Sequence, residues 1–321
     1  MRSSGAPDHR GLRHEAALYN SEDELLSVAV PFLTGGAEAG EPTIAVFGEK
    51  NAELIHAALG DTVNISFLDA TAHYSRPATT IKTYRKLLAQ YVAEGAQQIR
   101  VTGEIPRAGT GLPWEWWARY EATANHAYED FPLWVICAYD TRTTPARVLT
   151  DVTRTHPHLV TADGERVAND RFEDPAAFLT RSPASGADPL EATPPMINLP
   201  HPTPADARRA VRAASQASLL DHAEVADMVY AVNEAVTNAI HHGRPPVHLR
   251  IWPRLDHMVA TVTDRGHGPP DPYAGLLPPT PASPAGVGLW LIHQTCSHVT
   301  LGTDHEGFTI RLTAGVPDLT A

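Results

Sequence analysis

The sequence predicts two folded units, an α/β unit with a parallel sheet in the N-terminal half and an α+β unit in the C-terminal half. Three observations support this. Helix and strand signals alternate up to residue 138. A proline-rich stretch follows, and after it come an amphipathic helix, a strand and a glycine-rich helix start. We therefore expect domains at residues 10–181 and 205–316, joined by an extended linker at residues 182–204.

The N-terminal alternation is regular. Such alternation predicts a parallel sheet that is covered by helices on both faces, with its ligand beyond the carboxyl ends of the strands. Helices are expected at residues 22–33, 52–59, 79–93 and 114–128, and short apolar strands at residues 43–47, 63–68, 99–101 and 133–138.

Three residues are candidates for binding a ligand at this sheet edge. Glu104 and Tyr139 follow or end predicted strands, and Trp117 lies on the intervening helix. The aromatic rings could contact a small, largely apolar ligand, and the polar groups of Glu104 and Tyr139 could orient one polar atom. Aromatic residues at helical spacing are also common in ordinary cores. This half has no Gly-x-x-x-x-Gly-Lys motif, so no phosphate-binding loop of that type is expected.

Several short patterns in this half resemble the MEDS (DcmR-type) sensory domain over residues 10–181. The resemblance implies a RecA/KaiC-like α/β unit of signalling proteins that senses small one-carbon or hydrocarbon-type ligands. Three residues of the pattern, His14, Cys137 and His156, are metal-binding types, but nothing in their spacing indicates a metal site. The patterns are His14…Tyr19, Pro31-Phe32-Leu33, Thr102-Gly103-Glu104, Trp114…Tyr120-Glu121, Cys137-Ala-Tyr139-Asp140 and Thr155-His156-Pro157.

In the C-terminal half, one predicted helix carries a polar pair. Apolar residues recur at helical spacing from Val225 to Ile240, and Gly243 ends the helix. Glu234 and Asn238 are four residues apart, so they share a face away from the apolar stripe. A carboxylate and an amide oxygen on one face suit a hard cation that bridges phosphates. The pair could also be ordinary exposed helix residues.

A strand predicted at residues 257–264 ends in a second polar position. The chain turns there on Gly266 and Gly268, directly after Asp264. A buried carboxylate at this place could accept a hydrogen bond from an exocyclic amine such as that of adenine. A plain turn after a strand is the alternative interpretation.

The third motif is a glycine turn into a helix. Gly286 and Gly288 precede the apolar stretch that starts at Leu289. Glycines let backbone N–H groups approach an anion, and a helix N-terminus favours phosphate. The turn could also be a simple helix-entry hinge. In this order, the three motifs together predict a pocket for Mg-ATP.

These motifs resemble the N, G1 and G2 boxes of the gyrase, Hsp90, histidine-kinase and MutL (GHKL) ATPase superfamily. The short spacing and the His-Gly after the N box resemble the anti-sigma-factor serine kinases. The resemblance covers residues 204–314 and implies a Bergerat-type α+β sandwich. The matching stretches are Glu234-Ala-Val-Thr-Asn238-Ala-Ile-His-His242-Gly243, Asp264-Arg-Gly-His-Gly268 and Gly286-Val-Gly-Leu-Trp-Leu-Ile292.

The resemblance also implies roles. Asn238 would coordinate Mg²⁺, Glu234 would be the general base or order the metal's water, and Asp264 would bind the adenine amine. The implied cofactors are ATP and Mg²⁺, and the implied partner is an anti-sigma antagonist of the STAS type, phosphorylated on Ser or Thr, or a sigma factor. A homodimer is compatible with this. Gly266, Gly268, Gly286, Gly288 and Leu289 would frame the adenine and the phosphates.

Two other functions remain open at this point. The segment between the G boxes, residues 269–285, is the ATP lid by position and holds seven prolines but no Lys or Arg. Because phosphoryl transfer usually recruits a cation besides Mg²⁺, a nucleotide-gated binding module without turnover is one alternative. A sensor histidine kinase is the other, and it is disfavoured because its candidate acceptor, His222, lies too close to Glu234 for a separate hairpin.

The bulk composition narrows the function further. A net charge of -12 argues against non-specific binding to nucleic acid, which depends on Lys and Arg at phosphates. Two cysteines fit a reducing compartment without a disulfide framework. No apolar run approaches the length of a bilayer span, and residues 1–13 lack the apolar core of a signal peptide. We therefore expect a cytoplasmic protein that does not bind membranes.

Overall fold

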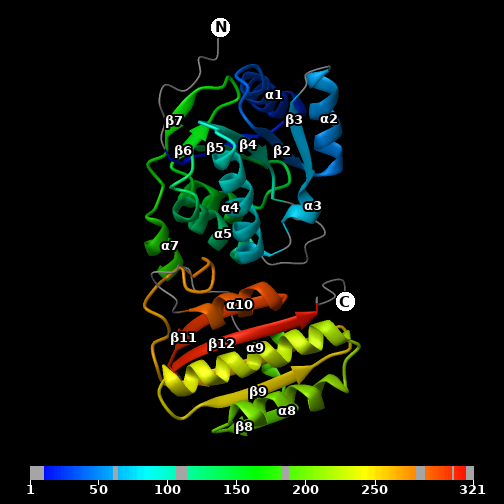
Figure 1. Ribbon diagram of the computed structural model, residues 1–321, viewed down its shortest axis with the longest axis vertical. Coiled ribbons are helices and arrows are strands. Elements are labelled where there is room, and N and C mark those ends of the chain that lie inside the picture. The colour runs from blue at the N-terminus through cyan, green and yellow to red at the C-terminus, as the bar shows by residue number, and fades with distance from the viewer. Residues whose placement is uncertain are drawn as a thin grey trace. The chain divides into compact units, whose positions relative to one another are not determined.

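The protein contains two compact units, with the division between Leu179 and Thr180 for most of the chain. The computed structural model in Figure 1 describes residues 11–60, 64–74, 76–105, 114–181, 188–279, 286–305 and 307–315. Among the helices in these ranges, none has both the length and the hydropathy to cross a bilayer.

A seven-stranded sheet with the order β3-β2-β4-β5-β1-β6-β7 forms the centre of the first unit. Neighbouring strands are parallel except for the last pair, β6 and β7. The predicted α/β class is therefore confirmed, and the sheet is extended by the additional strands β1, β6 and β7. The strands are β1 (Arg13–Tyr19), β2 (Thr43–Phe47), β3 (Ile65–Asp69), β4 (Ile99–Gly103), β5 (Leu133–Asp140), β6 (His158–Val160) and β7 (Arg166–Ala168).

Helices cover both faces of this sheet (Figure 1). On one face, Leu25 of α1 and Ile55 of α2 pack against Phe47 and Ala138 of the strands. On the other face, Tyr84 of α4 and Tyr120 of α5 lie over β4 and β5 around a small cavity. The helices are α1 (Glu22–Glu38), α2 (Glu49–Leu59), α3 (Ala70–His73), α4 (Pro77–Ala93), α5 (Trp114–Ala127), α6 (Ala146–Thr155) and α7 (Pro175–Arg181).

Helix α1 continues beyond the predicted end at residue 33, through two glycines. A Cβ on Gly36 would overlap Thr43 Oγ1 and lie 2.9 Å from Arg100 Cδ. The glycines therefore allow the helix to pass close to the sheet, and here a packing requirement outweighs the low helix propensity of glycine.

The second unit is an antiparallel five-stranded sheet of the order β11-β12-β10-β9-β8, with helices on one face. The α+β sandwich expected for the C-terminal half is thus confirmed. Its elements are η1 (Pro189–Ala192), β8 (Ile197–Pro200), α8 (Pro204–Ser215), α9 (His222–His241), β9 (His248–Pro253), β10 (His257–Asp264), α10 (Val287–Thr295), β11 (His298–Asp304) and β12 (Gly307–Gly315).

The core of this unit lies between the sheet and helices α8, α9 and α10. Helix α9 spans the core, with Met228, Val232 and Val236 buried along its inner face. Its start is fixed by a capping box, in which Asp221 Oδ1 accepts from the Glu224 N–H at 2.8 Å and Glu224 Oε2 accepts from the Asp221 N–H at 2.9 Å. The inner face anchors α9 and leaves Glu234 and Asn238 on another face, as the spacing predicts.

The expected linker is largely folded onto the second unit. Residues 197–200 form β8, which pairs antiparallel with β9. On the face of the sheet away from the helices, the Trp252 indole donates to the Thr193 carbonyl at 2.8 Å, and Arg311 pairs with Glu191. A short strand, β8, thus lies within the stretch predicted as a linker, residues 182–204, and belongs to the sheet of the second unit.

Candidate functional site

Two of the three motifs of the C-terminal half, the Glu234–Asn238 pair and the Gly286–Gly288 turn, meet where the start of α10 approaches α9. A Cβ placed on Gly288 would lie 2.7 Å from Glu234 Oε2 and 3.9 Å from Asn238 Nδ2. The Glu234 carboxylate and the Asn238 amide therefore face the glycine turn that begins α10. Only a residue without a side chain fits against this carboxylate without displacing it.

Glu234 is held by a short chain of polar contacts that the sequence did not reveal. The Asn233 amide donates to Glu234 Oε1 at 3.1 Å, and Arg208 of α8 donates to Asn233 Oδ1. Burial, and secondarily the Glu234 charge, raise the pKa of the Tyr230 phenol one turn earlier on α9. Asn233 thus fixes the carboxylate and connects it to a cation on the neighbouring helix.

Asp264 ends β10 and is buried, with 4% of its surface exposed. One of its oxygens, Oδ1, accepts from the backbone N–H groups of Arg244 at 3.0 Å and Gly266 at 2.6 Å. Among the described residues, Oδ2 accepts no hydrogen bond. The carboxylate is therefore fixed in orientation with one acceptor oxygen free, which suits an amine donor such as that of adenine.

Glycines are required at several turns around Asp264 and α10. Gly268 and Gly286 have φ values of +73° and +87°, in the left-handed region that favours glycine. A Cβ on Gly243 would overlap the Asp264 carboxylate and lie 2.6 Å from the Ala239 carbonyl oxygen. The backbone of Gly243, at the end of α9, therefore packs directly against the Asp264 side chain. Within the lid predicted at residues 269–285, positions 280–285 lie outside the described residues.

A cavity of about 670 Å³ shares only the turn at Gly266 with this site. It is lined by His248 and Arg250, which alternate along β9 with the core residues Leu249 and Ile251, so it opens on the sheet face away from the helices. It includes the turn at Gly266 but neither Glu234 nor Asn238. The nucleotide motifs, rather than this cavity, define the candidate site.

The structure does not gather the three predicted sensor residues into one group. Glu104 accepts from the Gly48 N–H at 3.0 Å and from the Asn51 amide at 2.9 Å, both at the start of α2. Tyr139, by contrast, donates to Glu121 Oε1 of α5 at 2.6 Å. Glu104 therefore belongs to the α2 side of the sheet, and Tyr139 belongs to the α5 side.

Trp117 lies in an aromatic cluster on the α5 side. Its ring contacts those of Tyr74 and Tyr120 edge to face, with centroids 5.6 Å away in both cases. The side chain is buried, and its indole Nε1 has no hydrogen-bond partner among the described residues. Trp117 is thus mainly a core residue that keeps one unused donor.

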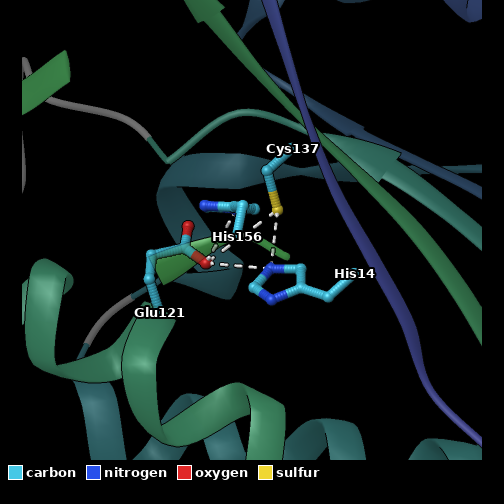
Figure 2. A group of neighbouring side chains, drawn as sticks. All are labelled: His14, Glu121, Cys137 and His156. Carbon is cyan, nitrogen blue, oxygen red and sulfur yellow. Dashed lines mark hydrogen bonds and ion pairs between the residues drawn. The ribbon is translucent and has the colours of Figure 1, made fainter. Parts of the chain in front are cut away.

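A cluster of four polar side chains lies on the same side of the sheet, and the sequence did not predict that they come together. His14 of β1, Glu121 of α5, Cys137 of β5 and His156, just after α6, point toward one another (Figure 2). Burial, followed by the neighbouring His14, lowers the pKa of His156 to about 3, so its ring is neutral. Burial and the Glu121 charge raise the pKa of the Cys137 thiol. In the sequence, Glu121 is part of the Trp114…Tyr120-Glu121 pattern, but its spacing from His14, Cys137 and His156 does not predict a group.

Comparison with protein families agrees with this division of the chain. Residues 13–157 match the MEDS family, described as the methanogen/methylotroph, DcmR sensory domain. Residues 199–314 match the histidine kinase-like ATPase domain family. No curated protein shows significant similarity to the chain. The chain thus contains a MEDS sensory domain followed by a histidine kinase-like ATPase domain, a domain type that binds ATP, usually with Mg²⁺.

Proposed function

We propose that the ATPase domain is a protein serine/threonine kinase that phosphorylates an anti-sigma antagonist of the STAS type, or sequesters a sigma factor, under control of the MEDS domain. The observation that carries this proposal is the approach of Glu234 and Asn238 to the Gly288 turn. A metal-binding amide, a carboxylate and a helix N-terminus in one place suit a metal-bound triphosphate next to a base.

Each of three residues, Asn238, Asp264 and Glu234, has a separate role in the proposed phosphoryl transfer. Asn238 holds Mg²⁺, which neutralises charge on the phosphates, and the free Oδ2 of Asp264 accepts from the adenine amine. Glu234 takes the proton from the attacking Ser or Thr hydroxyl, whose oxygen forms the new bond to the γ-phosphorus while the bond to the β-phosphate oxygen breaks and ADP leaves. Positioning and electrostatics carry most of such a reaction.

Arg208 is a cation near the proposed base, but it does not take the place of a lid lysine or arginine. It binds Asn233, which in turn donates to Glu234, so its charge lies behind the base rather than over the phosphates. This arrangement orients Glu234 but does not replace a lid lysine. The observation favours slow turnover and keeps a nucleotide-gated binding module as the second candidate.

The MEDS domain is proposed to bind a small, largely apolar ligand. The buried indole N–H of Trp117, without a partner among the described residues, supports a ligand with one acceptor atom in the α5 cluster. Trp117 and Tyr139 remain proposed ligand residues in this cluster, whereas Glu104, on the α2 side of the sheet, is not part of it. Quenching of tryptophan fluorescence by candidate hydrocarbon derivatives, and its loss in Trp117→Phe, would support this, whereas a response to ATP alone would contradict it.

Incubation of the full chain with labelled Mg-ATP and candidate anti-sigma antagonists tests the kinase proposal. Acid-stable phosphoserine or phosphothreonine on the partner supports it. ATP binding without transfer supports the binding module, and acid-labile phosphohistidine on the chain itself would contradict both. His222 opens the same helix that carries Glu234, which disfavours that last outcome.

Asn238→Ala removes the proposed Mg²⁺ ligand and tests the metal site directly. We expect Mg-dependent ATP affinity to fall about 100-fold or more, given that even outer-shell partners of metals cost about 10- to 100-fold. Asn198→Ala, an exposed Asn on β8, is the control and should change nothing. Unchanged Mg-dependent binding in Asn238→Ala would disprove the assignment of the metal site.

A further inference from the structure

A buried polar cluster in the MEDS domain brings together side chains from four distant parts of the chain. Its members are His14, Glu121, Cys137 and His156, and one donor atom from each lies within 4.8 Å of all the others. Figure 2 shows the two rings, the carboxylate and the sulfur directed at a common centre. The exposed fraction of the His14, Glu121 and His156 side chains is 2% or less. This cluster is independent of the nucleotide site.

Hydrogen bonds outside the cluster fix which ring nitrogen of each histidine carries the proton. His156 Nδ1 lies 2.9 Å from the Val152 carbonyl oxygen, so Nδ1 is the donor and Nε2 faces the cluster with a lone pair. His14 Nδ1 lies 3.1 Å from Asn125 Oδ1. The Asn125 amide nitrogen donates to the Thr155 carbonyl at 2.8 Å, which confirms that its oxygen is the atom facing His14.

The centre of the cluster therefore has too many acceptors. Two lone pairs on Nε2 atoms, one carboxylate oxygen and one sulfur meet there, and the thiol is the single neutral donor. His156 Nε2 is buried and has no hydrogen-bond partner among the described residues. A proton on His14 would satisfy Glu121 but would leave His156 Nε2 unpaired. A divalent cation would satisfy all four atoms at once.

We propose that these four residues form a metal centre that takes Zn²⁺ or a related divalent first-row transition metal. Cys137 binds as the thiolate after its proton passes to solvent, and Glu121 binds as the carboxylate. Their two negative charges balance the divalent cation, and the neutral histidines add none. The loaded centre is electrically neutral, which is the condition for placing ions in a dry interior at low cost.

The distances fit this ligand set. With metal bonds of 2.0–2.3 Å, neighbouring donor atoms of a tetrahedral site are about 3.3–3.7 Å apart. The structure has 3.2 Å from His14 Nε2 to Glu121 Oε2, 3.5 Å from His156 Nε2 to the same oxygen, and 3.5 Å from His14 Nε2 to Cys137 Sγ. Cys137 Sγ lies 4.0 Å from Glu121 Oε2, and the other donor pairs lie within 4.8 Å, so small side-chain rotations bring the four atoms to metal-bond distances.

The ligands are also supported in the way that metal ligands usually are. Both histidines donate their outer N–H to an oxygen, and Tyr139 donates to the outer Glu121 oxygen at 2.6 Å. Such outer hydrogen bonds orient the ligands and raise their basicity. These hydrogen bonds hold His14, Glu121 and His156 in place with their inner atoms directed at the common centre.

A small cavity adjoins the proposed centre. It has a volume of about 30 Å³ and is lined by His14, Glu121 and Cys137 together with the rings of Tyr74 and Tyr120. This volume admits one water or a ligand of similar size. A small ligand that enters the domain would therefore reach the metal from the aromatic side, where it can add to the metal or displace Glu121.

The first experiment uses the full wild-type chain, stripped of metal and without nucleotide. Titration with Zn²⁺ should give one tight site per chain and raise the thermal midpoint, because the metal binds the folded state. Co²⁺ should give an intense near-ultraviolet band from thiolate coordination. Failure of wild type to bind either ion, or Co²⁺ binding without the thiolate band, would overturn the proposal whatever the variants do.

Variants then assign the ligands. Cys137→Ser should abolish the cobalt–thiolate band, and Glu121→Gln should weaken Zn²⁺ binding about tenfold or more, with far-ultraviolet circular dichroism unchanged. Cys296→Ser, at the second cysteine of the chain, is the matched control and should keep the band. Equal metal binding in wild type and Cys137→Ser would overturn the assignment and leave the cluster as a buried His14–Glu121 ion pair.

Discussion

The two sites of this chain are built in opposite ways. The nucleotide site depends on short, local motifs, with glycines and backbone N–H groups around Asp264 and the start of α10. The cluster in the MEDS domain depends on long-range packing of side chains from β1, α5, β5 and the end of α6. A locally built site is visible in the sequence, whereas a site assembled by the fold is not.

This difference explains which residues could be predicted. Glu234 and Asn238 are one helical turn apart, so their shared face follows from periodicity alone. Cys137 is separated from His14 by more than a hundred residues, and only the sheet order β5-β1-β6 brings their strands together. No spacing rule connects them. The same reasoning covers Arg208, which meets Asn233 across two helices.

The fold shows the same limit. Apolar periodicity predicted strands β2, β3, β4 and β5 of the first sheet and β10 of the second, and β2 and β10 were predicted with their observed bounds. Strand β8 was missed because it has four residues among prolines, and its pairing with β9 is a tertiary interaction. Strand β1 was missed because His14 and Glu15, both buried, interrupt its apolar pattern. Buried polar residues of this kind break the apolar pattern of a strand, because the fold supplies hydrogen-bond partners that the sequence does not show.

The largest expected effect comes from Glu234→Gln. The amide keeps the shape of the side chain but cannot accept the hydroxyl proton, so partner phosphorylation should fall about 10²- to 10⁴-fold. ATP affinity should stay within a few-fold, because metal and backbone contacts hold the ground state. Single-turnover phosphorylation and calorimetry measure the two quantities. Equal losses of rate and binding would make Glu234 a metal-site residue instead.

The folded linker gives the next largest effect. An ATPase fragment that begins at Asp188 should be more stable than one that begins at His201 by about 2–4 kcal/mol, because the shorter fragment loses strand β8 and the Trp252–Thr193 hydrogen bond. Urea unfolding of both fragments measures this. Equal stability would show that residues 188–200 contribute nothing and would support the boundary at residue 204.

Asp264→Asn tests the nucleotide site at a single oxygen. The Asn oxygen can keep accepting from the Arg244 and Gly266 N–H groups, so the midpoint of unfolding should change little. Its NH₂ group then takes the place of Oδ2 and meets the adenine amine donor to donor. We expect ATP affinity to fall about tenfold, with the preference for ATP over GTP lost. Wild-type protein that binds ATP and GTP equally would remove this role from Asp264.

The smallest effect should come from Gly288→Ala, and it tests whether the nucleotide site depends on the close approach of backbone to side chain. The new Cβ would lie 2.7 Å from Glu234 Oε2 and must displace that carboxylate, whose side chain can move. Because a flexible side-chain end yields at low cost, stability should change by less than about 1 kcal/mol, while ATP affinity falls about three- to tenfold. Gly302→Ala is the control, since a Cβ at Gly302 meets no atom within 4 Å and that glycine is not in the left-handed region. Equal ATP affinity in the two variants would mean that the α10 turn does not contact the nucleotide. The nucleotide site would then not be built from glycines and backbone groups, and its contrast with the side-chain cluster of the MEDS domain would no longer hold.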